Sequence, residues 1–277
     1  MEGKKSLPLT YDPFFKKIFN PDIYPERLSR LISSIIGTNV TVKYILSNEY
    51  SMLPSTSLLL LDIIVQLEDG SIANVEIQKN PYTFPGERMS CYSADLLLRQ
   101  YTRVKSKLGK DFTYKDMRTV YTIVMYEKSP NECLKDRFAN IYLHHGKTIF
   151  DTDVNLNLLQ EYYIVNLDVF KNSKYAKDIN ELNAWLSLLT TDSTDNLATL
   201  ISNYPWMESI CQDISEYLYR PEEVISMFSK ALKKMDENTV NFMIEQMKKA
   251  LEEKDATISE KDAEIAALQA KLAALEH

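Results

Sequence analysis

The chain has 277 residues, 45% of them hydrophobic, and a formal net charge of −7 at pH 7, which is enough for one large domain or one domain with an appendage. Its cysteines, Cys91, Cys133 and Cys211, show neither paired nor metal-binding spacing, which excludes a secreted disulfide framework and favours the cytoplasm. No signal peptide precedes Tyr11 and no apolar run approaches membrane-spanning length, so we expect no membrane partner. The net charge argues against nucleic acid, but residues 79–118 hold nine Lys and Arg against four Asp and Glu.

The first predicted elements are two helices and a strand. Asp12 is a good N-cap and Pro13 a good first helical residue, so a helix is expected to begin there. Residues 27–36 have the pattern of an amphipathic helix that stops at Gly37, and residues 40–46 have the pattern of a strand.

A hairpin is predicted over residues 58–78, where two apolar runs flank the turn signal at residues 68–70. A three-residue loop ending in a left-handed glycine would put Asp62 opposite Glu76, whereas a two-residue loop would put it opposite Ile77. Only the three-residue loop keeps the apolar residues together on one face, which we expect to be the core. The opposite face carries the polar residues Asp62, Gln66, Asn74, Glu76 and Gln78.

Two carboxylates that face each other across a strand pair destabilise a sheet. A divalent cation would remove the repulsion between Asp62 and Glu76, and hard cations such as Mg²⁺ prefer carboxylate oxygens. The alternative is that both acids lie on a solvated sheet face.

An Asp, about a dozen residues of hairpin and then Glu-x-Gln, here Asp62 and Glu76-Ile77-Gln78, resembles the active-site core of the PD-(D/E)XK nucleases. More narrowly, it resembles the recombination-promoting nuclease (Rpn) family, also called PD-(D/E)XK nuclease family transposases. Leu61 stands where the superfamily name has Pro. The resemblance implies an α/β fold with a restriction-endonuclease-like mixed sheet flanked by helices. It also implies metal-dependent hydrolysis of DNA phosphodiester bonds, in recombination, transposition or phage defence.

The same resemblance implies a site for Mg²⁺, or for Mn²⁺ or Ca²⁺, made by Asp62, Glu76 and the Ile77 carbonyl. The pattern D-x-x-F-K-x-x-F that begins at Asp12 also resembles the start of Rpn proteins. Related nucleases often place an acid from the first helix at the metal, so Asp12 is a candidate, although capping explains it equally well. Glu49 is a further acidic candidate.

Gln78 stands where the superfamily has its lysine. An amide can orient a water molecule but carries no charge to stabilise a developing anion, so Arg88 or Lys79 would have to substitute.

Residues 87–107 are predicted to form a long helix with two distinct faces. One face carries Arg88, Tyr92, Arg99 and Arg103, which with Lys79 we expect to bind DNA. The other face is expected to pack on the sheet and carries Met89, Ala94, Leu97, Tyr101 and Val104. The alternative is a solvated polar face on which Asp95 pairs with Arg99.

Three further strands are predicted at residues 120–126, 138–144 and 162–170, the first of them central and the second near an edge. A helix containing Trp185 is expected over residues 179–189. His144 and His145 are adjacent on a predicted strand and would point to opposite faces, which disfavours a two-histidine metal site.

The expected organisation is a nuclease-like domain at residues 1–190, a helical extension at 191–235 and a coiled-coil tail at 236–277. Heptad a positions hold Ile244, Leu251, Ile258, Ile265 and Leu272. Mostly Ile at a with Leu at d favours a parallel two-stranded coiled coil, and hence a homodimer, over a charged helix folded back on its own domain. The competing functions are a non-catalytic DNA-binding or oligomerising module that retains the nuclease fold, and a coiled-coil adaptor.

Overall fold

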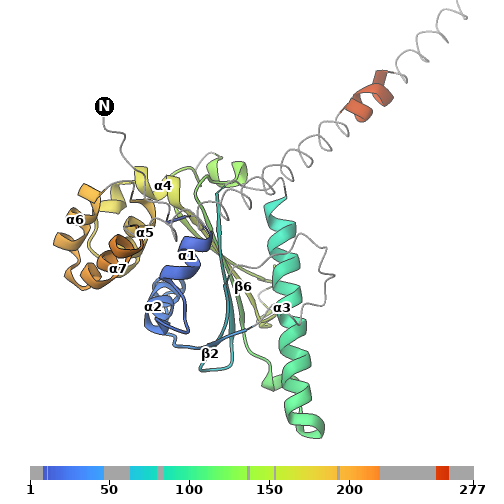
Figure 1. Cartoon of the computed structure of the whole chain (residues 1–277). Helices are drawn as coiled ribbons and strands as arrows, with labels where there is room; N and C mark the ends of the chain where they lie inside the picture. Colours follow the sequence, from blue (N-terminus) through green and yellow to red (C-terminus); the bar gives the residue numbers. More distant parts are fainter. Residues whose placement is uncertain are drawn as a thin grey trace, which may run out of the picture. The chain divides into compact units, whose positions relative to one another are not determined.

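The computed structural model describes residues 9–10, 12–46, 63–79, 84–135, 138–152, 154–191, 194–218 and 254–261. The chain divides into two compact units, Met1–Lys233 and Lys234–His277. The described part of the first unit is a mixed sheet with helices on both faces (Figure 1). This arrangement agrees with the predicted α/β class.

The described residues form a six-stranded sheet in the order β1-β2-β3-β4-β6-β5. Strands β3, β4 and β6 run parallel to one another in the middle, while β1, β2 and β5 are joined antiparallel. The strands are β1 (Val42–Ile45), β2 (Ile63–Leu67), β3 (Ile72–Gln78), β4 (Val120–Tyr126), β5 (Leu143–Lys147) and β6 (Gln160–Asn166). The predicted central position of residues 120–126 is therefore confirmed.

Among the described helices of this unit, α3 alone covers one face of the sheet, and the others gather on the opposite face (Figure 1). The helices are α1 (Asp12–Ile18), α2 (Pro25–Ile36), α3 (Pro85–Leu108), α4 (Leu167–Asn172), α5 (Glu181–Thr190), α6 (Thr194–Asn203) and α7 (Glu208–Leu218). Gly37, with a φ of 72°, ends α2 as predicted, because a left-handed residue closes the last turn.

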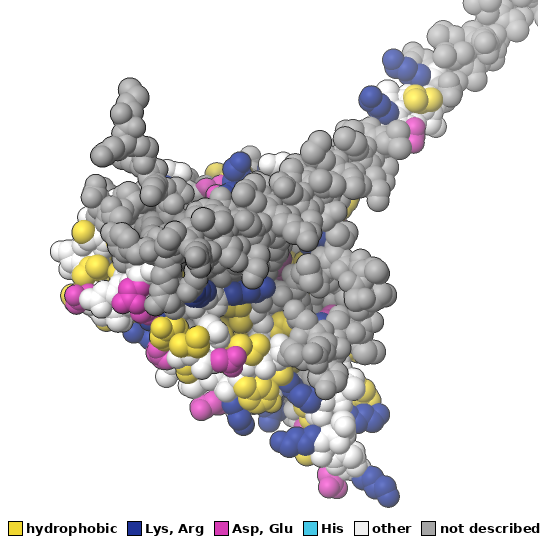
Figure 2. Space-filling view, in the orientation of Figure 1, with side chains coloured by type: hydrophobic (Ala, Val, Ile, Leu, Met, Phe, Trp, Pro, Cys, Tyr) yellow, Lys and Arg dark blue, Asp and Glu magenta, His cyan; other side chains and the backbone are white. Residues whose placement is uncertain are grey.

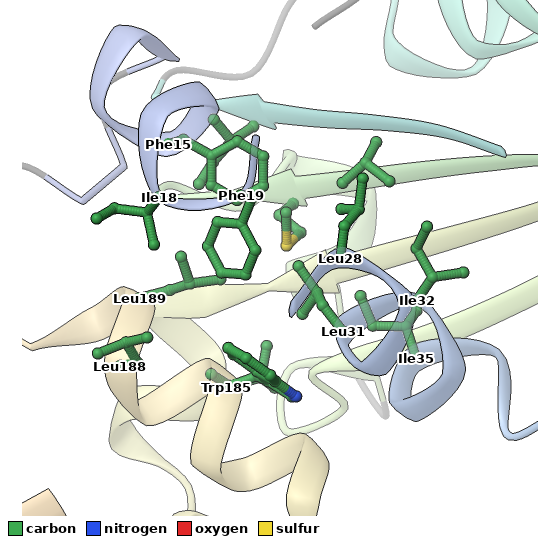
Figure 3. Packing of buried hydrophobic residues seen from close by; sticks show 14 of the residues in the cluster. Phe15, Ile18, Phe19, Leu28, Leu31, Ile32, Ile35, Trp185, Leu188 and Leu189 are labelled. Carbon is green, nitrogen blue, oxygen red and sulfur yellow. The ribbon is translucent and has the colours of Figure 1, made fainter. Parts of the chain in front are cut away.

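The main core lies between the sheet and the larger group of helices (Figure 3). Its aromatic centre joins α1 and the turn after it to α5: the Phe15 and Phe19 ring centroids are 4.7 Å apart, and the Phe19 and Trp185 centroids are 5.6 Å apart. Leu200 of α6 and Ile214 of α7 are buried in the same core. One apolar core is therefore shared by α1, α2, α5, α6 and α7.

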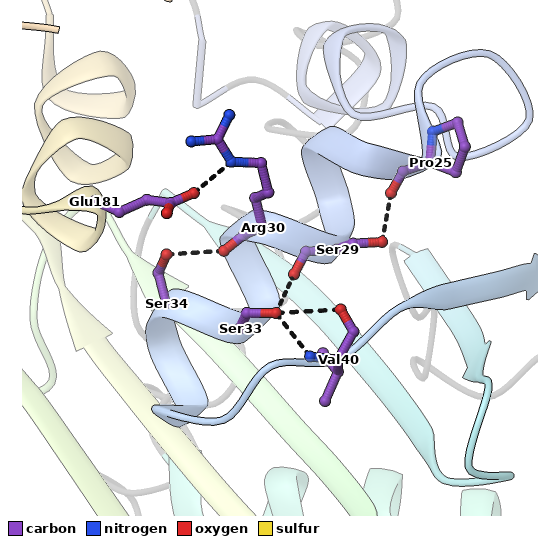
Figure 4. A network of polar contacts seen from close by, with 7 residues as sticks. All are labelled: Pro25, Ser29, Arg30, Ser33, Ser34, Val40 and Glu181. Carbon is purple, nitrogen blue, oxygen red and sulfur yellow. Dashed lines mark hydrogen bonds and ion pairs between the residues drawn. The ribbon is translucent and has the colours of Figure 1, made fainter. Parts of the chain in front are cut away.

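Serines on α2 connect that helix to the edge strand β1 (Figure 4). Ser33 Oγ accepts a hydrogen bond from Val40 N at 2.9 Å, and Ser29 Oγ accepts one from Val42 N at 2.9 Å. Arg30 on the same helix pairs with Glu181 of α5, with Nε and Oε1 2.5 Å apart. The two serine hydroxyls satisfy backbone N–H groups at the start of an edge strand, which has a neighbouring strand on one side only.

The hairpin has the predicted register for every described pair. Ile63 pairs with Val75 and Val65 with Ala73, and the loop of residues 68–70 closes through a 3.0 Å bond from Gly70 N to Leu67 O. Gly70 has a φ of 91°, a conformation that glycine adopts without a steric penalty. Asp62 itself lies outside the described residues.

The alternative of a solvated polar face is wrong for β3. Every residue of β3 is buried, including Asn74, Glu76 and Gln78. On this second face Ile64 and Ile72 pack against Tyr92 and Leu96 of α3. The reason is that β3 pairs with a parallel strand in mid-sheet, and parallel strands are covered on both faces.

Two strand predictions were wrong in their bounds. Residues 138–141 turn back on themselves, with Ile141 N donating to Phe138 O at 2.9 Å, so β5 begins only at Leu143. Strand β6 ends at Asn166 because α4 starts at Leu167, where the Asp168 carboxylate accepts hydrogen bonds from the Val169 and Ser129 amides.

Within the second unit, residues 254–261 are helical and Ile258 is exposed in the single chain. The rest of the predicted heptad series lies outside the described residues, so the coiled coil stays a prediction. In the described parts of the chain no helix is both long and apolar enough to cross a membrane.

Gly70→Ala is expected to lower the free energy of unfolding by about 1–3 kcal/mol, because alanine at a positive φ is strained. The new Cβ would also lie 3.3 Å from the Arg118 Cγ. Gly86→Ala is the matched control: Gly86 lies in the first turn of α3, a Cβ added there would meet no atom within 4 Å, and its φ is not positive. Chemical denaturation should show Gly86→Ala unchanged or stabilised by about 0.4–1 kcal/mol. Equal losses for both variants would contradict the assigned turn.

Candidate functional site

Glu76 and Gln78 lie next to each other on the face of β3 that α3 covers. Their exposed fractions are 4% and 7%, and Gln78 Nε2 donates a hydrogen bond to Glu76 Oε1. Residues two apart on a strand share a face, so the Glu-x-Gln spacing brings this pair together. The carboxylate and the amide predicted from the sequence are thus adjacent and almost fully removed from solvent.

The first two turns of α3 lie over the carboxyl end of β3. Met89 packs against Val124 and Tyr126, and these two residues of β4 pair in register with Glu76 and Gln78. Pro85 occupies the first turn of α3, where its missing N–H costs no hydrogen bond, so the helix can start directly above the end of the strand. The first turns of α3 therefore cover Glu76 and Gln78.

A buried carboxylate is costly unless hydrogen bonds or a cation compensate for lost hydration. The Gln78 amide supplies one hydrogen bond to Glu76, but the Gln78 Oε1 is buried and has no hydrogen-bond partner among the described residues. Two oxygen-bearing side chains on one strand face match the oxygen ligands that Mg²⁺, Mn²⁺ and Ca²⁺ prefer. The residues present therefore fit a hard divalent cation.

The other predicted ligands are only partly described. Asp62 and Glu49 lie outside the described residues, and α1 begins at Asp12 although the Asp12 side chain is not described. Ile77 is on β3, between the two polar residues of the pair. Among the residues that the structure describes, no three His, Cys, Asp or Glu side chains form a cluster suited to a metal ion.

Glu127 holds the segment before α1 at the carboxyl end of β3. Its backbone N donates to Gln78 O at 2.8 Å, and its Oε2 accepts from Thr10 Oγ1 at 2.6 Å. Its Oε1 lies 3.9 Å from Lys79 Nζ. The start of α1, the end of β3 and a half-buried lysine are thus brought to one place, which sequence spacing alone did not reveal.

The predicted orientation of α3 was only partly right. Tyr92, expected on the DNA-facing side, is 1% exposed and packs into the sheet with Ile72, whereas Ala94, expected on the sheet side, is exposed. Met89 is buried on the sheet as expected. The polar side of the helix turns inward because the sheet surface beneath it is itself partly polar.

Two arginines of this face are held by neighbours one helical turn away. The Arg99 guanidinium is 10% exposed and its Nη2 lies 2.5 Å from Asp95 Oδ2, so the i,i+4 pair considered from the sequence exists but is buried instead of solvated. Arg88 is half-buried and donates from Nη2 to the Tyr92 hydroxyl at 2.7 Å. Arg103 is also half-buried.

Two polar residues in the same layer were not among the candidates predicted from the sequence. Asn74 and Thr122 pair in register across β3 and β4 and are fully buried. Neither the Asn74 amide nor the Thr122 hydroxyl has a hydrogen-bond partner in the described part of the chain. The available signal was a polar residue in the middle of an otherwise apolar central strand, which is uncommon unless it is partnered or functional.

One of three comparisons with known proteins found a match. No match was found among curated proteins or among solved structures. A family model described as PD-(D/E)XK nuclease family transposase matches residues 9–264, which is most of the chain and includes the hairpin, α3 and the central strands. The chain therefore belongs to the PD-(D/E)XK nuclease family transposases.

Proposed function

We propose that the protein is a metal-dependent DNA endonuclease that hydrolyses phosphodiester bonds. The observation that carries the proposal is the buried Glu76–Gln78 pair at the carboxyl end of β3, in a chain that belongs to a nuclease family. Recombination, transposition or phage defence would be its setting. The competing function is a DNA-binding or oligomerising module that keeps the fold without the chemistry.

The proposed metal site consists of Asp62, Glu76 and the Ile77 carbonyl, with Asp12 as a further candidate. The register supports the first pair, because Asp62 directly precedes Ile63, whose partner Val75 directly precedes Glu76. The bond from Thr10 to Glu127 supports Asp12, because it holds the segment before α1 at the end of β3.

A divalent cation at this place would polarise the scissile phosphate and lower the pKa of an attacking water. The chain's own residues would do the rest. The Gln78 amide is placed beside Glu76 and can orient a water through its oxygen. Helix α3 covers this end of β3 and excludes bulk water, which strengthens the electrostatic interactions at the site.

Gln78 carries no charge, so a cationic side chain must stabilise the developing anion. Lys79 follows it directly and is half-buried near Glu127, and Arg88 sits in the first turn of α3 above the strand end. We propose these two as the cationic groups at the phosphate, and Arg103 as a further DNA contact. Their bonds to Glu127 and Tyr92 would pre-orient Lys79 and Arg88, which limits the loss of side-chain entropy on binding.

Glu76→Gln is expected to abolish plasmid nicking in Mg²⁺, because an amide cannot replace the carboxylate ligand. Asp62→Asn should have the same effect. In wild type, Mg²⁺ at about 100 times its dissociation constant should stabilise the fold by about 2.7 kcal/mol, and both variants should lose that rise in melting temperature. DNA affinity measured in EDTA should remain.

Glu161→Gln is the matched control for the nicking assay and the thermal melt. Glu161 is a partly buried acid of the same sheet that pairs with His145, on a strand position whose register partner is Tyr121. It should nick DNA and gain stability with Mg²⁺ as wild type does. If wild type neither nicks DNA nor gains melting temperature with Mg²⁺, the nuclease proposal is wrong. The non-catalytic binding module would then be the function.

Arg99→Ala separates a structural arginine from a DNA contact. Arg99→Ala removes one partner of a buried ion pair, so the free energy of unfolding should fall by about 3–5 kcal/mol. The double variant Asp95→Ala/Arg99→Ala should lose less than the sum of the two single variants. Additive losses in urea titrations would show that the pair contributes no coupling. If Arg99→Ala instead weakened DNA binding and left the free energy of unfolding unchanged, Arg99 would be a DNA contact.

We also propose that the tail forms a parallel coiled coil and makes the protein a homodimer. The support is the heptad series and the exposed Ile258 of the described helical stretch. Truncation after Lys234 should reduce the mass measured by light scattering from that of a dimer to that of a monomer. An unchanged mass would assign any dimer contact to the first unit.

A further inference from the structure

The far end of α3 and the turns after it form a positively charged projection, here called the α3 tip (residues 101–118). The turns are two 3₁₀ helices, η2 (Gly109–Asp111) and η3 (Tyr114–Asp116). Gln100 Oε1 accepts from Arg118 N at 2.7 Å just before β4 begins, so the residues between them extend beyond the start of that strand (Figure 1). The tip holds six Lys and Arg against two Asp, in a chain whose net charge is −7.

Three aromatic rings are gathered on the α3 tip. The Tyr101 and Phe112 ring centroids are 5.4 Å apart, and Phe112 and Tyr114 are 5.6 Å apart. Tyr101 and Phe112 are half-buried, whereas Tyr114 is 78% exposed. The Tyr101 and Tyr114 rings are nearly parallel, with an interplanar angle of 17°. Two supporting rings therefore hold a third ring in place and leave it open to solvent.

The α3 tip also carries lysines, and Figure 2 shows dark-blue side chains over the lower end of α3. Lys105 Nζ donates to the Tyr101 hydroxyl at 2.7 Å, and that hydrogen bond raises the pKa of Lys105, so its ammonium group is charged at neutral pH. Lys107, Lys110 and Lys115 are exposed.

Two acids of the tip, Asp111 and Asp116, oppose this charge, but six Lys and Arg outnumber them. The Asp116 carboxylate accepts from Thr113 N at 2.7 Å and from Thr113 Oγ1 at 2.9 Å. The same bonds lower the pKa of Asp116, so it serves as an ionised cap for η3. The charge that the tip presents to solvent is thus dominated by its lysines.

We propose that the α3 tip binds a single-stranded segment of nucleic acid, with Tyr114 stacked on a base and the lysines at the phosphates. Lysines alone would suit any polyanion, but an exposed aromatic ring between them adds a surface for the flat face of a base. In a duplex the flat faces of the bases are covered by neighbouring base pairs and cannot stack on Tyr114. An acidic protein segment has no bases at all. That the nucleic acid is DNA rests on the proposed function. The tip adds that the DNA is recognised as a single strand.

The tip is separate from the candidate catalytic site. Arg88 at the site and Lys105 at the tip lie on one helix, and at 1.5 Å per residue they are about 25 Å apart along its axis. Substitutions at Tyr114 therefore change the tip without touching Glu76.

The test is fluorescence anisotropy in EDTA with a labelled oligothymidine of about 20 nucleotides and a duplex of the same length. Tyr114→Ala should weaken single-strand binding by about five-fold or more, leave duplex binding unchanged, and be rescued by Tyr114→Phe, which keeps the ring. Lys110→Ala should reduce the slope of log affinity against log salt by about 0.7. The controls are Ile149→Ala, at a side chain that is also 78% exposed, and Lys43→Ala, at an exposed lysine of β1.

Three results would overturn the proposal: unchanged single-strand affinity in Tyr114→Ala, an equal loss for the duplex, or competition by oligoglutamate as effective as that by oligothymidine. The binding assay in EDTA is independent of cleavage. Wild type that nicks plasmid while Tyr114→Ala binds normally would overturn the tip alone. Wild type that does not nick while the tip variants lose single-strand affinity would overturn the nuclease alone.

Discussion

The burial of β3 on both faces is the constraint on which the rest of the structure depends. Every side chain from Ile72 to Gln78 is removed from solvent, so a polar residue on this strand must be hydrogen-bonded, ion-paired or bound to a ligand. Gln78 donates a hydrogen bond to Glu76, whereas the Gln78 Oε1 has no hydrogen-bond partner among the described residues. The proposed cation site therefore rests on the position of the strand within the sheet as much as on the residue types.

The two faces of the sheet differ in polarity. The face that meets α1, α2 and α5 is apolar and holds the aromatic centre around Trp185, where one large-to-small substitution typically costs about 3–5 kcal/mol. The α3 face mixes small apolar clusters with polar side chains that lack hydrogen bonds within the described chain. A large apolar core on one side allows the other side to keep polar groups that weaken packing but carry function.

Helix α3 links the candidate site to the proposed single-strand contact. Its first turns cover the end of β3, its middle is anchored by Tyr92 and by the buried Asp95–Arg99 pair, and its last turns carry Lys105 beyond the sheet. A rigid helix anchored at its middle keeps a fixed distance between its ends. A strand bound at the tip would therefore meet the nuclease site in a defined position, which is how remote binding energy can orient a substrate for reaction.

The sequence by itself determined the hairpin register, because side chains alternate with period two and Gly70 can adopt the positive φ that the three-residue loop requires. It also determined the end of α2 at Gly37 and the Glu-x-Gln pair on one strand face. Only the tertiary structure decided which faces are buried: the polar side of α3 turns inward because the sheet below it is polar as well. Hydrophobic periodicity reports that a helix has two faces, but which face is covered depends on the surface that another part of the chain presents. The end of β6 at Asn166 has the same cause, because the Asp168 side chain is engaged by Ser129, which is distant in the sequence.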